Sequence, residues 1–218
     1  MDKNRGKLLL LVMVIILVFA GTAGYYGYQN YYYVKTEDAI VTGDIYKIAP
    51  KVAGKIKRLL FDEGSQVQAN QVVAEQEEST LAAGGVLEHL LIRSPISGVI
   101  LQRTAKAGEV VGAGSTVALV VDKTQLYVQA NVEETEARLV KEGQLVDITL
   151  DMYPGRRFQG KVIKLGEAAQ SAFSLLPPVN AGGNFTKVTQ RIPVKIGFFD
   201  ETVDLRPGIN AAVAIHVR

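Results

Sequence analysis

The residues best suited to acid–base or metal chemistry are the two histidines, His89 and His216, because imidazole titrates near neutral pH and is a common metal ligand. Neither lies near an acid or a nucleophile in a recognised catalytic motif. The sequence also lacks the P-loop, GxSxG and HExxH motifs of nucleotide hydrolases, serine hydrolases and zinc peptidases. It has no cysteine, which excludes thiol catalysis and cysteine-ligated metals. We therefore expect a protein that is not an enzyme and carries no cofactor.

Three acids, Glu133, Glu134 and Glu136, form the one cluster that resembles a metal site. The segment that contains them, "EETEARLVKEG", has its acids first and its bases last, and it ends at Gly143. That order matches the dipole of a short helix closed by glycine. We expect a solvated first helical turn here, with no metal bound.

An uncharged apolar run near the N-terminus, "LLLLVMVIILVFAGTA" from Leu8 to Ala23, is typical of a membrane anchor. A helix from Leu8 to Tyr28 would be about 31 Å long, and a bilayer's hydrocarbon layer is about 30 Å thick. Lys3, Arg5 and Lys7 precede the run, so the positive-inside rule places the N-terminus in the cytoplasm. The rest of the chain is then extracytoplasmic.

The alternative is a secretory signal peptide cleaved near "GTA". We favour an uncleaved anchor because six tyrosines follow the apolar run, and tyrosine prefers the membrane interface. They are Tyr25, Tyr26, Tyr28, Tyr31, Tyr32 and Tyr33. The remaining chain is electrically neutral, so no basic field for nucleic acid remains.

An internal repeat with an offset of 44 residues indicates two copies of one small β unit. Seven of 21 positions are identical. The identical pairs are Gly54/Gly98, Ile56/Ile100, Gly64/Gly108, Val67/Val111, Ala69/Ala113, Val73/Val117 and Ala74/Ala118. Each copy has a strand–turn–strand pattern that exposes one apolar face. Two copies packed together form one β-sandwich with a shared core.

The segment between the copies, residues 75–93, is short. "VLEHLLI" places Leu87, Leu90 and Leu91 on one face of a short helix, about 10 Å long, after an "AAGG" turn. The alternatives are a reduced helical hairpin that contacts a partner, a plain loop that closes the sandwich, and an engineered deletion joined by "AAGG".

The C-terminal half alternates with the period of half-buried strands, as in "LYVQANV" and "QLVDITL". A turn is expected at Pro154 and Gly155, and Pro193 indicates a strand edge or a bulge. Several antiparallel strands with one short helix predict a small closed barrel. The apolar loop "SLLPPVNAGG" either packs on the barrel or meets a partner.

The twin β units with an insertion between them resemble the biotinyl/lipoyl-like half-motifs of HlyD-type membrane fusion proteins, also called periplasmic adaptors. "AFSLLPPVNAGGNFTKVTQRIPVKI" and "YVKTEDAIV" resemble the EmrA-type multidrug adaptors of that family. No lysine occurs between Lys57 and Lys106, so a carrier with a modified lysine is not expected. The resemblance covers nearly the whole chain apart from the hairpin, which is much shorter here.

The resemblance implies a mainly β fold in four parts: a cytoplasmic tip and anchor (1–33), a first strand of the barrel region (34–48), a lipoyl-like domain (49–121) and a β-barrel (122–218). It also implies a homo-oligomer that works with a major-facilitator transporter in the inner membrane and exports drugs or amphiphiles. The short hairpin argues against an outer-membrane channel as partner. The expected partner contacts are apolar side chains of the insertion and of the apolar loop. They are Leu81, Leu87, Leu90, Leu91, Phe173, Leu175 and Leu176.

Two other functions fit the sequence less well. One is a membrane-tethered module that binds a peptide or glycan and has no transporter. The other is an extracytoplasmic enzyme, which no motif supports. Ligand binding by the ectodomain favours the first, and activity lost on substitution of His89 or His216 favours the second.

Overall fold

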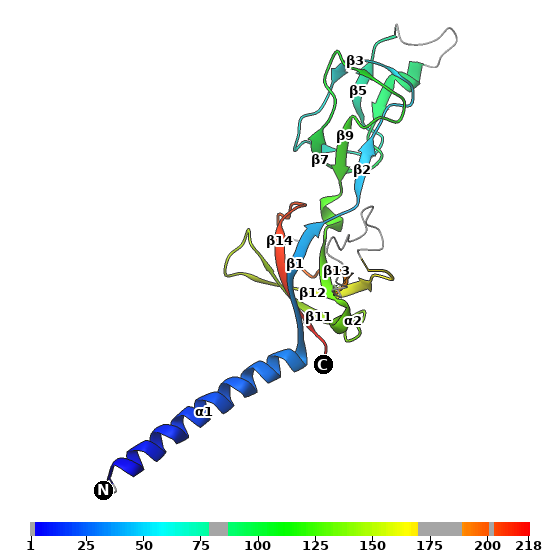
Figure 1. The fold of residues 1–218 in the computed structure, drawn as a ribbon. Coiled ribbons are helices and arrows are strands. Elements are labelled where there is room, and N and C mark those ends of the chain that lie inside the picture. The colour runs from blue at the N-terminus through cyan, green and yellow to red at the C-terminus, as the bar shows by residue number, and fades with distance from the viewer. Residues whose placement is uncertain (1–2, 79–86, 170–188, 201–202) are drawn as a thin grey trace, which may run out of the picture. The chain divides into compact units, whose positions relative to one another are not determined.

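The computed structural model describes residues 3–78, 87–169, 189–200 and 203–218 (Figure 1). The chain forms two compact units. The first comprises Met1–Ile40, Val128–Asp200 and Asn210–Arg218, and the second comprises Val41–Tyr127 and Glu201–Ile209.

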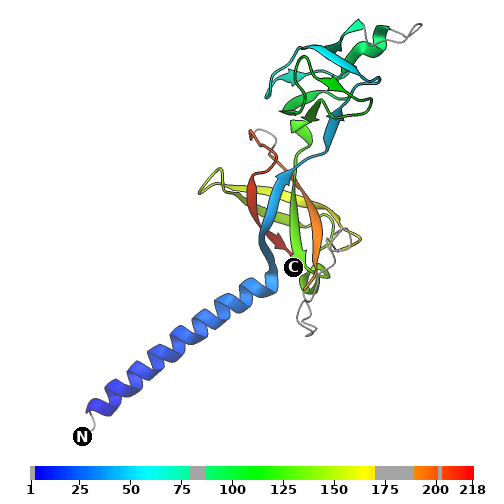
Figure 2. The same cartoon turned by 45° about the horizontal axis from the view of Figure 1, so that its top comes forward.

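The first unit contains the N-terminal helix and a closed six-stranded barrel with strand order β1-β10-β13-β12-β11-β14. Its elements are α1 (Lys3–Tyr32), β1 (Tyr33–Thr42), β10 (Tyr127–Glu133), α2 (Glu134–Ala137), β11 (Leu145–Leu150), β12 (Arg157–Leu165), β13 (Arg191–Phe198) and β14 (Asn210–His216). Figure 2 shows α1 running directly into β1, with β14 beside β1. The predicted small closed barrel is confirmed.

The barrel core comes from strict alternation along its strands. In β11, Val146, Ile148 and Leu150 are buried, whereas the residues between them are partly or fully exposed. In β14, Val213 and Ile215 are buried in the same way. Successive side chains of a strand point to opposite faces. The buried apolar side chains therefore fill the barrel, and the side chains between them line its outer surface.

Two local predictions in this unit need correction. The helix expected up to Gly143 ends at Ala137, because Leu139 and Val140 donate to carbonyls three residues back and so form tight turns. Pro193 is not at an edge, since β13 lies between β10 and β12 in a closed barrel. The other prediction, a bulge, agrees better with the structure, because the register of β12 against β13 shifts between Val162 and Lys164.

The second unit is a sandwich of two four-stranded sheets, β2-β9-β7-β4 and β6-β5-β3-β8. Its strands are β2 (Ile45–Ile48), β3 (Gly54–Leu59), β4 (Gln66–Val67), β5 (Val72–Gln76), β6 (Leu91–Arg93), β7 (Gly98–Arg103), β8 (Val110–Val111) and β9 (Ala118–Val121), and its 3-10 helices are η2 (Leu87–Leu90) and η3 (Lys123–Gln125). Both sheets contribute to a single buried apolar cluster, whose members include Ile48, Ile56, Ile92 and Ile100.

The two repeat copies interlock. The short strand of each copy pairs with the other copy, β4 with β7 and β8 with β3. The turn glycines obey the same symmetry: Gly64 donates to the Ile100 carbonyl and Gly108 donates to the Ile56 carbonyl, both at 2.8 Å. Both glycines have φ of +85°, a conformation that glycine adopts without steric cost. The predicted sandwich of two half-motifs is therefore confirmed.

The structure changes the limits of two predicted segments. Residues 45–48, expected to continue the barrel strand, form β2 and pair with β9 of the sandwich. In the expected insertion 75–93, Glu75 pairs with Leu91 and so both ends belong to the sheet. The helical face expected there is a single 3-10 turn, because Leu91 already lies in a strand.

Candidate functional site

The two histidines have different surroundings. His89 is exposed on η2. His216 Nε2 lies 2.7 Å from Asp147 Oδ2, and its ring meets Tyr33 edge-on with 4.7 Å between centroids. Within the described residues no hydroxyl bonds to His216. Asp147 and His216 are 69 residues apart in the chain, and the pairing of β11 with β14 brings them together.

The residues expected to contact a partner divide into three groups. Leu87 is 63% exposed on η2 and is free to make contacts. Leu90 is buried and packs inside the sandwich unit, while Leu91 is half-buried in β6. Outside the described residues lie Leu81, Phe173, Leu175 and Leu176.

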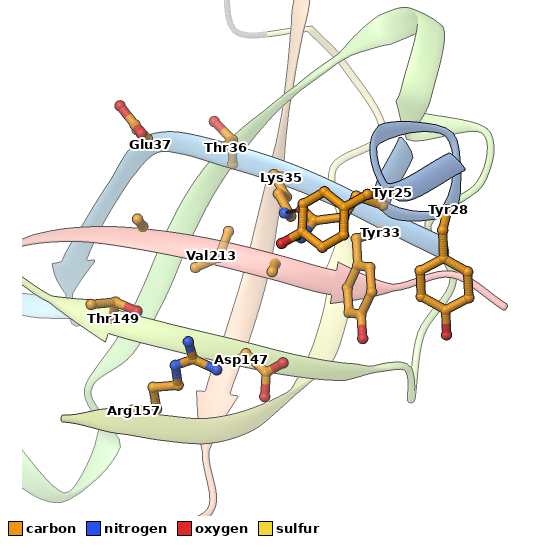
Figure 3. Close-up of a pocket in the computed structure, with 13 residues that line it drawn as sticks. Tyr25, Tyr28, Tyr33, Lys35, Thr36, Glu37, Asp147, Thr149, Arg157 and Val213 are labelled. Carbon is orange, nitrogen blue, oxygen red and sulfur yellow. Dashed lines mark hydrogen bonds between the residues drawn. The ribbon is translucent and has the colours of Figure 1, made fainter. Parts of the chain in front are cut away.

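A groove on the outer face of the barrel has a volume of about 670 Å³. That volume lies within the range of roughly 300–1,000 Å³ of small-molecule sites. We call it the β14 groove. It is lined by Tyr25, Tyr28, Gln29, Tyr33, Lys35, Thr36, Glu37, Asp147, Thr149, Arg157, Ala212, Val213 and Ala214 (Figure 3).

Small side chains on β14 create the hollow. Ala214 lies between Lys35 of β1 and Asp147 of β11 in the pairing register, and Ala212 lies opposite Thr149. The short side chains of Ala212 and Ala214 point outward and form the floor of the groove, and longer side chains of β1 and β11 form its two walls. Since strands lie about 4.8 Å apart, the flanking strands are about 10 Å apart.

The helix α1 supplies one end of the groove. Tyr25, Tyr28 and Gln29 of α1 line it together with Tyr33. Figure 3 shows the three tyrosines gathered where β14 ends, with Asp147 and Arg157 farther along on β11 and β12. Lys35 bonds Gln29, which ties the helix to the first barrel strand.

The C-terminus also binds the junction of helix and barrel. The backbone N–H of Val217 donates to the Tyr32 carbonyl at 3.0 Å. The Arg218 guanidinium lies 3.8 Å from the centroid of the Tyr31 ring, within the range of a cation–π contact. The last strand therefore fixes the end of α1 on the barrel.

One acid near this junction has a shifted pKa. Burial, and secondarily the charge of Glu133, raise the pKa of Glu136 above its usual range. Glu136 lies with Tyr26, Tyr33 and Lys35 in a second hollow beside α1. The described residues contain no cluster of three metal-binding side chains.

Sequence patterns alone did not identify the β14 groove. Its floor and walls come from β1, from the consecutive strands β11 and β12, and from β14, three segments that are far apart in the chain, so no local spacing joins them. The available signal was the pair of alanines at outward positions of "NAAVAIH", where a strand surface usually carries larger side chains.

Two known families match consecutive parts of the chain. Residues 44–123 match "RND MFP, barrel-sandwich hybrid domain" and residues 126–215 match "YknX-like beta-barrel domain". The matches agree with the sandwich and the barrel of the structure.

Curated relatives extend this likeness over nearly the whole chain. The chain is 38% identical over 216 residues to "Putative efflux system component YhbJ" of Bacillus subtilis, which covers 97% of this chain and 94% of that protein. It is 33% identical over 157 residues to "Multidrug export protein EmrA" of Escherichia coli, covering 70% of this chain and 40% of EmrA. It thus spans less than half the length of that EmrA.

A solved structure shows the same fold. The periplasmic adaptor protein EmrA has a TM-score of 0.55 at 15% sequence identity, with 84% of this chain and 98% of that chain covered.

Proposed function

The chain belongs to the membrane fusion proteins of the EmrA/HlyD type, and on this basis we propose that it is the membrane-anchored adaptor of an efflux system for drugs or other small amphiphiles. The observation that carries the proposal is the match, over 97% of the chain, to a protein named as an efflux system component. We propose an assembly with an inner-membrane transporter, of the major-facilitator type, on its extracytoplasmic face.

The anchor is central to this role. Leu11–Gln29 is long and apolar enough to cross a membrane, and its mean hydropathy is 1.8. The side chains of Leu17 and Phe19 are each 70% exposed, which is costly in water and favourable in lipid. An anchor confines the adaptor beside its transporter, so the effective concentration rises and weak contacts between ectodomains suffice.

The short insertion supports a complex without an outer-membrane channel. Only residues 77–90 separate β5 from β6, too few for a long coiled coil. The Bacillus subtilis relative has just 6% of its length outside the match, which supports a naturally short insertion. We propose that Leu81, Leu87, Phe173, Leu175 and Leu176 contact the transporter or a second copy of the chain, and that the adaptor is a homo-oligomer. Leu90 and Leu91 serve the sandwich instead.

The proposal excludes catalysis and a covalently bound carrier group. The sandwich has interlocked halves, but its sequence has no lysine between Lys57 and Lys106 to be modified. The His216–Asp147 pair has no nucleophile beside it in the described residues. The proposed role is that of a non-catalytic adaptor.

Co-purification tests this function. The full chain, tagged at its N-terminus and extracted in mild detergent, is expected to retain a transporter of twelve or fourteen helices, and deletion of its gene is expected to lower drug resistance. Leu17→Arg places a charge in the candidate span and is expected to reduce both transporter co-purification and drug resistance. Gly112→Ala, where an added Cβ meets no other atom, is the control and should leave both unchanged. Recovery of the chain without a transporter, together with ligand binding by the ectodomain, would identify a tethered binding module instead.

A further inference from the structure

The β14 groove carries charges of both signs. Four charged side chains line it: Lys35 and Arg157 are cationic, and Glu37 and Asp147 are anionic. A ligand with a single charge would therefore meet two like charges as well as two opposite ones. A ligand that carries both charges a short distance apart matches the groove better, because each charge then has its own partner.

Arg157 and Asp147 lie close enough together to bind opposite charges of one ligand. Arg157 pairs with Thr149 in the register and Asp147 pairs with Gln159, so Arg157 and Asp147 are diagonal neighbours. Such neighbours are about 7–8 Å apart and within reach of long side chains. No ion pair joins Arg157 to any described residue, while Asp147 Oδ2 lies 2.7 Å from His216 Nε2. Figure 3 shows both side chains on the same side of β11 and β12.

The α1 end of the groove adjoins the end of the candidate membrane span. The candidate span ends at Gln29, and Gln29, Tyr25 and Tyr28 line the groove. Tyrosine rings occupy the membrane–water interface, where phosphates and amines of the lipids lie.

We propose that the β14 groove binds the head group of a zwitterionic phospholipid with a primary amine, of the phosphoethanolamine class, from the outer leaflet. The guanidinium of Arg157 donates to the phosphate, and the carboxylate of Asp147 accepts from the ammonium. A trimethylated amine has no N–H to donate, so choline lipids fit Asp147 less well. The bound lipid gives the barrel a second attachment to the membrane and restrains its rotation about α1.

Native mass spectrometry of the full chain tests the proposal. The chain is taken from nanodiscs with equal amounts of phosphatidylethanolamine, phosphatidylcholine and phosphatidylglycerol, and the retained lipids are counted. We expect phosphatidylethanolamine to be retained at least fivefold over either competitor. Arg157→Gln and Asp147→Asn should each remove most of that preference.

Two further variants separate recognition from general effects. Lys161→Gln removes a cation on the same face of β12, outside the groove, and should retain the preference. Ala214→Phe fills the floor, keeps all four charges and the His216–Asp147 pair, and should abolish the preference. Circular dichroism verifies that each variant is folded.

Three results would overturn the proposal: equal retention of the three lipids, preference for phosphatidylglycerol, or the same preference for phosphatidylethanolamine in Arg157→Gln as in Lys161→Gln. The lipid site depends on the anchor and not on a transporter. If the chain shows no lipid preference but still co-purifies with a transporter, the proposed function stands and the lipid site is refuted. If the chain shows the lipid preference but retains no transporter, only the proposed function is refuted.

Discussion

Gly98 shows how one residue of the repeat limits the packing of the sandwich. A Cβ added at this position would lie 2.2 Å from the Val121 carbonyl oxygen and 2.8 Å from its carbon. Both are backbone atoms of β9, the strand paired with β7, so they cannot move aside without breaking the pairing. At Gly112 an added Cβ would have no atom within 4 Å, and the backbone φ lies outside the left-handed region.

We therefore predict that Gly98→Ala destabilises the sandwich by about 1–3 kcal/mol or more, as overpacking does. Thermal unfolding of the full chain in detergent measures the effect. Gly112→Ala is the matched control and should change the unfolding temperature little. Equal effects of the two alanines would show that the tight approach of β7 and β9 is not rigid.

The Arg58–Glu75 pair joins neighbouring strands of the sandwich. Arg58 donates from Nε and Nη2 to the two carboxylate oxygens of Glu75, each at 2.8 Å. These hydrogen bonds hold the pKa of Glu75 below its usual range. The carboxylate is thus more acidic in the folded chain than in the unfolded chain.

For such a group, the stabilisation is complete above the pKa of the unfolded state, about 4.3 for glutamate, and is lost as the pH falls through the lower pKa of the folded state. We predict that Glu75→Gln lowers the unfolding temperature slightly at pH 7, because the pair is exposed to solvent. Below about pH 4 the difference from the natural chain should shrink. A difference that stays constant from pH 7 to pH 3 would refute the ion-pair account.

At the level of elements, the junction of α1 and β1 has no linker. α1 ends at Tyr32 and β1 begins at Tyr33. Val217 and Arg218 hold the last turn of the helix from the other side of the junction. The barrel therefore follows the candidate membrane span with no linker between them.

We predict that four residues, Gly-Ser-Gly-Ser, inserted between Tyr32 and Tyr33 leave the barrel folded and lower drug resistance at least fivefold. The physical reason is the lost coupling of barrel and anchor, which lets the barrel turn away from its partners. The same insertion after Gly155, at the β11–β12 turn, is the control and should have a small effect. Full resistance with the insertion at Tyr32 would show that the rigid junction is dispensable.

At the level of the whole molecule, two cores account for stability. Ile148 is fully buried in the barrel, and Ile100 is 1% exposed in the core of the sandwich. The two residues belong to different compact units. A cavity in one unit should therefore leave the other core packed.

We predict that Ile148→Ala and Ile100→Ala each cost about 2–5 kcal/mol, in separate unfolding transitions. Calorimetry of the full chain should show one transition moved by each variant and the other unchanged. If both variants move a single common transition, the units unfold together and their cores are coupled.

The sequence by itself determined the local features of this protein. The charge-free run predicted the long apolar helix, the offset of 44 residues predicted the twin units, and the period of two predicted the barrel strands. These signals are readable because each depends on neighbours in the chain: helix length, turn glycines and alternation are local constraints. Where prediction was wrong, as for the helix at Leu87–Leu91, pairing of Leu91 with Glu75 overrode a short local pattern.

Only the tertiary structure decided which residues meet. The exchange of β4 and β8 between the repeat copies, the contact of His216 with Asp147 and the alanine floor of the β14 groove all depend on strand register. Register arises from the packing of a whole apolar face, so no short stretch of sequence specifies it. For this reason the long apolar helix and the twin units were predictable, and the β14 groove was not.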